Sequence, residues 1–399
     1  MSEAQTPVQP NISASVGTQR QMDVYMAGLE GKKPAFPVSV EELEQKAKEV
    51  LTPEAYGYVA GSAGSENSAR ANLLGFAHWR IVPRFLRDVS KRDLRVSVLG
   101  QQLNAPLLLA PVGVLEIVHK EAELAVARAA RSLGTPMTLS TLSSNPLETV
   151  AKVMGEVPHW FQLYWPKSHE LAASFVTRAE RAGYGAIVVT LDTYHLGWRE
   201  RDIQNAYLPF LKGQGLANYF TDPVFRSSLP VPPEKDPRPA VVQFHQVVSN
   251  PALKWSDLAL LRKHTKLPVI LKGILSPEDA RQALDQGVDG IIVSNHGGRQ
   301  VDGVIPAIDA LPRVAAAVGN KTTLLFDSGI RRGADVFKAV ALGARAVLLG
   351  RPYCYGLAVG GEDGVRHVLQ NLLADLDLTL GLAGCASFAE LGPGNLVES

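Results

Sequence analysis

The chain has 399 residues, of which 46% are hydrophobic, so it can bury a large core. Lys and Arg number 40 and Asp and Glu 39, a net charge of +1, and this balance gives no reason to expect a nucleic-acid or membrane-surface partner. The two cysteines, Cys354 and Cys385, lack CxxC spacing, which argues against a disulfide scaffold or a zinc site and favours a reducing, cytoplasmic compartment.

The N-terminal segment is polar and lacks the basic start and apolar run of a signal peptide. We predict a disordered or extended tail over residues 1–37, followed over residues 38–100 by helices and a short hairpin. No apolar run in the chain approaches the ~18 residues that a membrane-spanning helix requires.

Eight short apolar runs recur from residue 107 onward, and each predicts a strand. Their near-continuous hydrophobicity is typical of strands buried on both faces of a parallel sheet. Most of the gaps between them hold helical patterns, and several of these end at glycine. The runs are 107–111, 137–140, 160–164, 186–192, 269–273, 290–295, 323–328 and 346–350.

This alternation predicts an α/β fold, namely a (β/α)8 TIM barrel over residues 38–392 with an N-terminal helical extension. The alternative is an open doubly wound sheet, which usually carries a GxGxxG turn after an early strand, and the chain contains no such motif. The connection after the fourth strand is exceptionally long, and we predict that residues 194–255 form a lid at the catalytic end of the barrel.

Polar residues and glycines follow nearly every predicted strand. Because the active site of a barrel lies at the C-terminal ends of its strands, we expect these residues to line one pocket. In chain order they are Pro111, Val112, Gly113, Ser140, Gln162, Tyr164, Thr190, Asp192, Arg199, Lys272, Ser294, His296, Arg299, Asp327, Ser328, Gly329, Arg331, Gly350 and Arg351.

Two features of this set suit an anionic ring with a phosphate. The segments SGIRRG (328–333) and GRP (350–352) follow the seventh and eighth strands, where barrels commonly bind phosphate, although they could also be turn glycines beside solvated arginines. Lys272 should point inward. It could be a Schiff-base amine, a charge that stabilises an electron-poor ring, or a lysine whose tip reaches solvent.

His296 and Asp192 suit a base and its orienting carboxylate, since imidazole titrates near neutral pH. A structural histidine is the alternative, and the lack of an HxH or HExxH partner argues against a metal site. Arg199 and Arg299 could together hold a substrate carboxylate, because guanidinium forks match its two oxygens. Asp192 could instead neutralise one of the arginines.

The motifs SNHGGRQ, LTLDT with GWR, LKG, FDSGIRRG and GRP resemble those of the FMN-dependent 2-hydroxy-acid oxidases and dehydrogenases over roughly residues 40–390. The segments APVGV, LPFLKG and NYFTDPVF are most similar to the lactate 2-monooxygenase and lactate-oxidase members of that family. The resemblance implies a bound FMN, a small-molecule 2-hydroxy acid and dioxygen as substrates, and a homo-oligomer of four or more copies. It also implies that Gly113 leaves room beside the flavin for larger substrates.

The same resemblance implies a role for each site residue. His296 would be the base and Asp192 its partner, Arg199 and Arg299 would clamp the substrate carboxylate, and Tyr58 and Tyr164 would bond the substrate. The implied cofactor contacts are Ala110, Pro111 and Val112 near the reactive edge of the flavin, Ser140, Gln162, Thr190 and Lys272 around its ring, Asp327 on the ribityl chain, and Gly329, Arg331, Gly350 and Arg351 at the phosphate, with Gly113, Ser294 and Ser328 as further cofactor contacts.

The implied reaction is FMN-dependent oxidation of an L-2-hydroxy acid of the lactate type to acetate, CO2 and water. Two alternatives within flavin chemistry stay open: an oxidase that releases the 2-keto acid and hydrogen peroxide, and a protein that binds FMN without turnover. A third alternative is a flavin-free aldolase barrel in which Lys272 forms a Schiff base.

Overall fold

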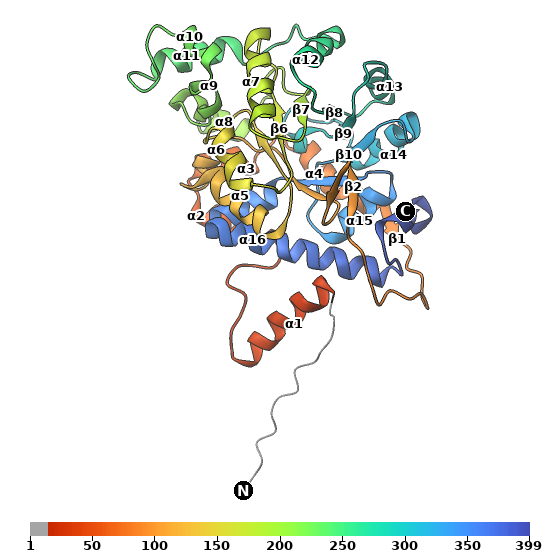
Figure 1. Ribbon diagram of the computed structural model, residues 1–399. Coiled ribbons are helices and arrows are strands. Elements are labelled where there is room, and N and C mark those ends of the chain that lie inside the picture. The colour runs from red at the N-terminus through yellow and green to blue at the C-terminus, as the bar shows by residue number, and fades with distance from the viewer. Residues whose placement is uncertain (1–14) are drawn as a thin grey trace.

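The computed structural model describes residues 15–399 and contains a closed barrel of eight parallel strands, so the predicted (β/α)8 fold is confirmed (Figure 1). The strand order around the barrel is β10-β11-β4-β5-β6-β7-β8-β9. These strands are β4 (Leu107–Leu109), β5 (Met137–Ser140), β6 (His159–Leu163), β7 (Ile187–Thr190), β8 (Val269–Ile274), β9 (Gly290–Val293), β10 (Thr323–Phe326) and β11 (Ala346–Leu349). All their residues are buried except the half-buried Gly273 and Thr323, which explains the near-continuous apolar runs.

Each barrel strand leads to a helix on the outside of the barrel. These helices are α5 (Ala122–Leu133), α6 (Leu147–Met154), α7 (His169–Arg181), α12 (Leu258–His264), α13 (Pro277–Asp285), α14 (Ala307–Val318), α15 (Gly333–Ala341) and α16 (Arg351–Leu382). The alanine-rich α5 packs against the long α16, so the first and last units of the barrel meet. α5 ends at Gly134, whose left-handed backbone (φ 63°) lets its N–H reach the carbonyls of Ala130 and Arg131.

The N-terminal extension holds α1 (Val16–Leu29), α2 (Val40–Val50), α3 (Pro53–Ala60) and α4 (Asn67–Leu74), and then the predicted hairpin, β2 (Val96–Val98) and β3 (Gln101–Leu103). The prediction of a disordered or extended tail over residues 1–37 is wrong for α1, and residues 1–14 lie outside the described part of the chain. The folded domain extends past the predicted boundary at residue 392, because β12 (Leu396–Glu398) pairs with β1 (Trp79–Ile81).

Polar contacts attach α1 to α16, and this is why its pattern escaped sequence analysis. The N–H of Gly17 donates to Asp377 Oδ2 at 2.9 Å, and Arg20 Nε donates to Asn371 Oδ1 at 3.0 Å. The large apolar side chains of this helix, such as Tyr25, are mostly exposed. Figure 1 shows α1 lying along one side of α16, away from the barrel strands.

The long connection after β7 is an ordered set of helices rather than an extended loop. It contains α8 (Glu200–Gln204), η3 (Pro209–Lys212), α9 (Ala217–Phe220), α10 (Pro223–Ser227), α11 (Arg238–Val247) and η4 (Trp255–Asp257). The rings of Tyr219 and Phe244 lie 4.9 Å apart edge to face in its interior. The fully buried Asn218 donates to the carbonyls of Ser140 and Thr141, so the connection is attached to the end of β5.

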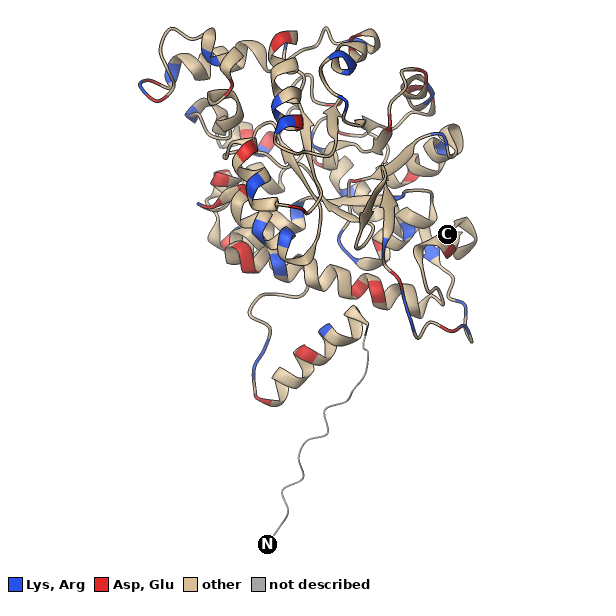
Figure 2. Cartoon of the chain, viewed as in Figure 1, with Lys and Arg blue, Asp and Glu red and all other residues tan. Residues whose placement is uncertain are grey.

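Acidic and basic residues are interspersed along the outer helices (Figure 2). Within residues 15–399, no helix has both the length and the apolar character needed to cross a membrane.

Candidate active site

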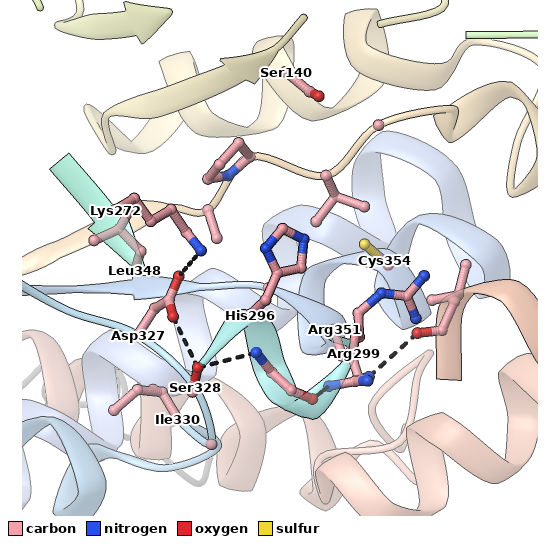
Figure 3. A pocket seen from close by; sticks show the side chains of 18 of the residues that line it. Ser140, Lys272, His296, Arg299, Asp327, Ser328, Ile330, Leu348, Arg351 and Cys354 are labelled. Atoms are coloured by element: carbon pink, nitrogen blue, oxygen red, sulfur yellow. Dashed lines mark hydrogen bonds and ion pairs between the residues drawn. The ribbon is translucent and has the colours of Figure 1, made fainter. Parts of the chain in front are cut away.

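One cavity at the strand ends collects most of the predicted site residues (Figure 3). Those that line it are Tyr58, Ala110, Pro111, Val112, Gly113, Ser140, Tyr164, Arg199, Lys272, His296, Arg299, Asp327, Ser328, Gly329, Arg331, Gly350 and Arg351. Four others do not line it: Asp192, Gln162 and Ser294 contact residues of the lining, and Thr190 contacts Gln162. Sequence analysis missed Val59, Leu142, Gly297, Ile330, Leu348 and Cys354, which mostly lack a polar side chain to signal them.

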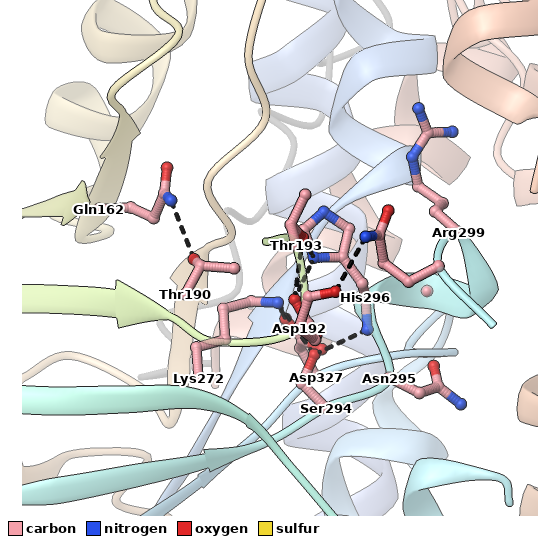
Figure 4. Close-up of polar contacts among 12 residues, drawn as sticks. Gln162, Thr190, Asp192, Thr193, Lys272, Ser294, Asn295, His296, Arg299 and Asp327 are labelled. Atoms are coloured by element: carbon pink, nitrogen blue, oxygen red, sulfur yellow. Dashed lines mark hydrogen bonds and ion pairs between the residues drawn. The ribbon is translucent and has the colours of Figure 1, made fainter. Parts of the chain in front are cut away.

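His296 and Asp192 form a pair beside this cavity (Figure 4). His296 follows β9 with a left-handed backbone (φ 57°), and its Nδ1 lies 2.8 Å from Asp192 Oδ1. Because a carboxylate only accepts, Nδ1 carries the proton and the free Nε2 is left as the basic atom. Thr193 Oγ1 donates to the same carboxylate oxygen at 3.0 Å.

The charges around the pair favour a neutral imidazole and an ionised carboxylate. Burial lowers the pKa of His296, and the negative charge of Asp192 only partly offsets this. Burial raises the pKa of Asp192, but the interactions with His296 and Lys272 outweigh it and the net pKa lies below the ordinary value. Gly273 is required here, because a Cβ on it would lie 2.8 Å from the Asp192 carboxyl carbon.

Two guanidiniums line the same cavity, and among residues 15–399 neither has a carboxylate oxygen closer than 4.0 Å. Arg199 is 5% exposed, and its ion pair with Asp202 spans 4.0 Å. Arg299 donates to the carbonyl of Gly61 and lies 5.2 Å from the ring centre of Tyr58. Burial, and then the positive charges of Arg199 and other arginines, lower the pKa of Arg299 to about 9. An anion between the two guanidiniums would relieve this repulsion.

Lys272 is a buried cation at the end of β8. Its Nζ donates to Ser294 Oγ at 2.9 Å and lies 3.1 Å from Asp327 Oδ2. Burial lowers the pKa of Lys272, but the negative charges of Asp327 and Asp192 outweigh it and the net pKa is raised. A raised pKa keeps this amine protonated, which is the reverse of what a Schiff-base nucleophile needs.

A chain of buried hydrogen bonds joins the ends of β5, β6 and β7. Ser140 Oγ donates to Gln162 Oε1 at 3.1 Å, and Gln162 Nε2 donates to Thr190 Oγ1 at 2.9 Å. Of these three residues, Ser140 lines the cavity. Gln162 and Thr190 lie behind Ser140 and hold its hydroxyl in place through the hydrogen-bond chain.

The residues predicted to bind a phosphate lie around the starts of α15 and α16, and their contacts differ. Arg331 lines the cavity, forms no ion pair within residues 15–399, and donates to the carbonyl of Ile330 at 3.0 Å. Such an uncompensated guanidinium fits a phosphate. Arg351 is instead occupied by protein groups, since its nitrogens donate to the carbonyls of Val59, Gly297 and Gly61.

Gly113 does not provide the space that the resemblance implied. A Cβ on this residue would lie 2.9 Å from the carbonyl oxygen of Leu142 and 3.0 Å from its Cβ. The missing side chain therefore allows two loops to approach each other, and Leu142 occupies the position that a Cβ would take.

Comparison with known proteins decides the family. The model of the FMN-dependent dehydrogenase family matches residues 47–398. The chain belongs to this family. It is 44% identical to the L-lactate oxidase of Lysinibacillus sphaericus over 94% of this chain and 97% of that protein, and 40% identical to human 2-hydroxyacid oxidase 1 over 87% and 93%. A crystal structure of mandelate oxidase superposes with a TM-score of 0.79 at 41% identity, over 88% of this chain and 96% of that one.

The protein is therefore an FMN-dependent oxidoreductase, and the predicted family, cofactor and enzyme class are confirmed. The site fits FMN independently of this match. Arg331 offers an uncompensated positive charge to a phosphate, and the protonated Lys272 offers one to the negative charge that an electron-poor ring takes up.

Proposed function

We propose that this member of the family oxidises an L-2-hydroxy acid of the lactate type with dioxygen. The observation that carries the proposal is that His296, Arg199 and Arg299 line a single cavity. Two guanidiniums suit a carboxylate and a free imidazole nitrogen suits the neighbouring hydroxyl, which are the two functional groups of a 2-hydroxy acid. Relatives named lactate oxidase, 4-hydroxymandelate oxidase and 2-hydroxyacid oxidase support the same substrate class.

Each residue of the site has a separate role in this reaction. Arg199 and Arg299 bind the carboxylate and thereby fix the α-carbon, which lowers the entropic cost of reaction. Nε2 of His296 takes the proton that leaves the substrate, and Asp192 stabilises the resulting imidazolium through Nδ1. Tyr164 stays protonated because burial raises its pKa, so its hydroxyl can donate to the substrate. FMN supplies the two-electron oxidation and the reaction with dioxygen.

We propose the monooxygenase outcome, in which lactate and dioxygen give acetate, CO2 and water. This outcome requires the keto acid and peroxide to react before either leaves. The helices after β7 support it, because Asn218 attaches them to β5 and Gly215 N–H donates to Glu116 Oε1 at 2.7 Å beside the cavity wall. The alternative, release of pyruvate and hydrogen peroxide, is favoured by the relatives named oxidases.

Product analysis in the presence of catalase separates the two outcomes. Catalase removes released peroxide, so acetate and CO2 that persist with catalase come from peroxide retained in the site. We expect one acetate per dioxygen with or without catalase. Pyruvate as the main product with catalase would contradict the monooxygenase proposal while leaving the oxidase intact.

The surroundings of the enzyme are also part of the proposal. We infer a cytoplasmic protein, since Cys354 and Cys385 are both free and buried. We infer a homo-oligomer of four or more copies from the family resemblance. Light scattering on the purified holoenzyme tests the second point.

A further inference from the structure

Gln300 is the last residue of the SNHGGRQ motif, and it lies outside the lining of the cavity. Its Nε2 donates to the carbonyl oxygens of Asp192 and His195, both at 2.8 Å. Its Oε1 accepts from Nη2 of Arg199 at 2.9 Å. We propose that Gln300 is a positioning residue: one amide aims Arg199 at the substrate carboxylate and fastens the loop 193–198 beside it.

The orientation of this amide follows from its partners. The two carbonyl oxygens can only accept and a guanidinium can only donate, so the nitrogen must face the carbonyls and the oxygen must face Arg199. A flipped amide would break all three hydrogen bonds at once. Gln300 therefore holds one side-chain conformation, and it transmits that order to Arg199.

The neutral charge of Gln300 matters as much as its shape. The other contacts of Arg199 are a hydrogen bond from Nε to the carbonyl of Arg299 at 3.2 Å and the 4.0 Å ion pair with Asp202. An amide oxygen orients the guanidinium without cancelling its charge. A carboxylate in the same place would form an ion pair with Arg199 and compete with the substrate.

The loop 193–198 depends on the same residue. Asp192 immediately precedes the loop and His195 lies within it, and Gln300 donates to the backbone carbonyls of both. Gly197 packs so closely that a Cβ would lie 2.6 Å from the carbonyl oxygens of Arg299 and Gln300. The loop exposes large side chains, with Trp198 69% exposed, and its other attachments include hydrogen bonds from Gly64 N–H to Trp198 O and from Ser249 Oγ to Tyr194 O. The Gln300 amide is the contact that joins the loop to Arg199.

The test compares two variants that affect the two halves of the amide differently. Gln300→Glu keeps an acceptor for Arg199 but adds a charge and loses both donor contacts. Gln300→Met has similar length and loses all three contacts without adding a charge. Gln246→Glu, an exposed position on α11, is the control for an added negative charge.

The readouts are oxalate binding to the oxidised holoenzyme, followed through the visible flavin spectrum, and hydrogen exchange of a peptide covering residues 193–198. Oxalate has no α-hydrogen, so it reports on the carboxylate clamp without turnover. We expect oxalate affinity to rank wild type above Gln300→Met above Gln300→Glu, with a loss of about tenfold or more in the last. In both variants the backbone amides of the loop 193–198 should exchange faster than in the wild type. The KM for L-lactate should rise by a larger factor than kcat falls.

A purely structural role predicts that Gln300→Glu, the closer mimic for Arg199, binds oxalate at least as well as Gln300→Met. That ranking, or unchanged exchange in the loop, would overturn the proposal. The inference rests on the proposed function in taking Arg199 as a carboxylate ligand, and the two can fail separately. Wild-type protein that binds no oxalate would refute the clamp. Wild-type binding with the wrong ranking would refute only the role of Gln300.

Discussion

Nδ1 of His296 lies 2.8 Å from Oδ1 of Asp192, although the residues are separated by 104 positions in the chain. The contact joins the ends of β7 and β9, the two neighbours of β8 in the barrel. It assigns the proton to Nδ1 and leaves Nε2 as the base, so the acid–base chemistry can be tested at each partner separately.

Replacing the base should abolish most turnover without removing the cofactor. A positioned general base contributes about 10²–10⁴-fold, so we expect kcat of His296→Gln with L-lactate to fall by that factor. FMN content, measured from the visible spectrum after gel filtration, should stay at the wild-type level because the proposed phosphate and ring contacts belong to other residues. Turnover within tenfold of wild type would remove His296 from the base role.

The carboxylate partner should set the acidic limb of the pH profile. Burial lowers the pKa of His296 and the Asp192 charge opposes that shift. Activity requires neutral imidazole, so kcat/KM should fall as the pH drops through the pKa of His296, below its ordinary value. Asp192→Asn removes the opposing charge, and the pKa should fall further. The acidic limb should then move to lower pH while the plateau rate drops, and a limb that moves to higher pH would contradict this pairing.

The phosphate site should distinguish FMN from riboflavin. A charge-assisted hydrogen bond contributes about 1.5–3 kcal/mol, so Arg331→Met should weaken FMN binding by about 10-fold to 100-fold and leave riboflavin binding unchanged. Titration of the apoprotein with each flavin measures both. Arg332→Met is the matched control, since that neighbour is exposed and pairs with Glu41. Equal weakening of both flavins would place Arg331 elsewhere than at the phosphate.

The helices after β7 should depend on one buried carboxylate. Asp222 is fully buried and accepts from the N–H groups of Val224 and Phe225 and from Arg178. Breaking such a pair costs about 3–5 kcal/mol, so Asp222→Ala should lower the free energy of unfolding by that amount. Glu148→Ala removes the exposed partner of the same arginine and should cost about 1 kcal/mol or less. Chemical denaturation of both holoenzymes measures the difference, and equal losses would contradict it.

The barrel could be predicted from sequence because its strands are buried on both faces, which leaves unbroken apolar runs. The strand-end residues followed, since a parallel barrel brings those ends together. Contacts between distant parts of the chain could not be predicted. α1 is held by polar bonds to α16, and Gly113 faces Leu142. The sequence contains no sign of either contact.

The functions of individual polar groups were also only partly predictable. Arg351 belongs to a motif typical of phosphate binding, yet its nitrogens are taken by backbone carbonyls of other segments. Gln300 belongs to the most specific motif of the chain, but its role depends on which end of the amide meets Arg199. Side-chain orientation of this kind is set by tertiary packing, and sequence spacing does not encode it.

The most direct test of the account is anaerobic mixing of the holoenzyme with L-lactate, followed through the visible flavin absorbance. We expect the flavin of the wild-type enzyme to lose its visible absorbance during the experiment. The flavin of His296→Gln should stay oxidised and yellow over the same time. Flavin that stays oxidised in wild-type enzyme with L-lactate and with larger L-2-hydroxy acids would contradict the central claim that this cavity oxidises a 2-hydroxy acid.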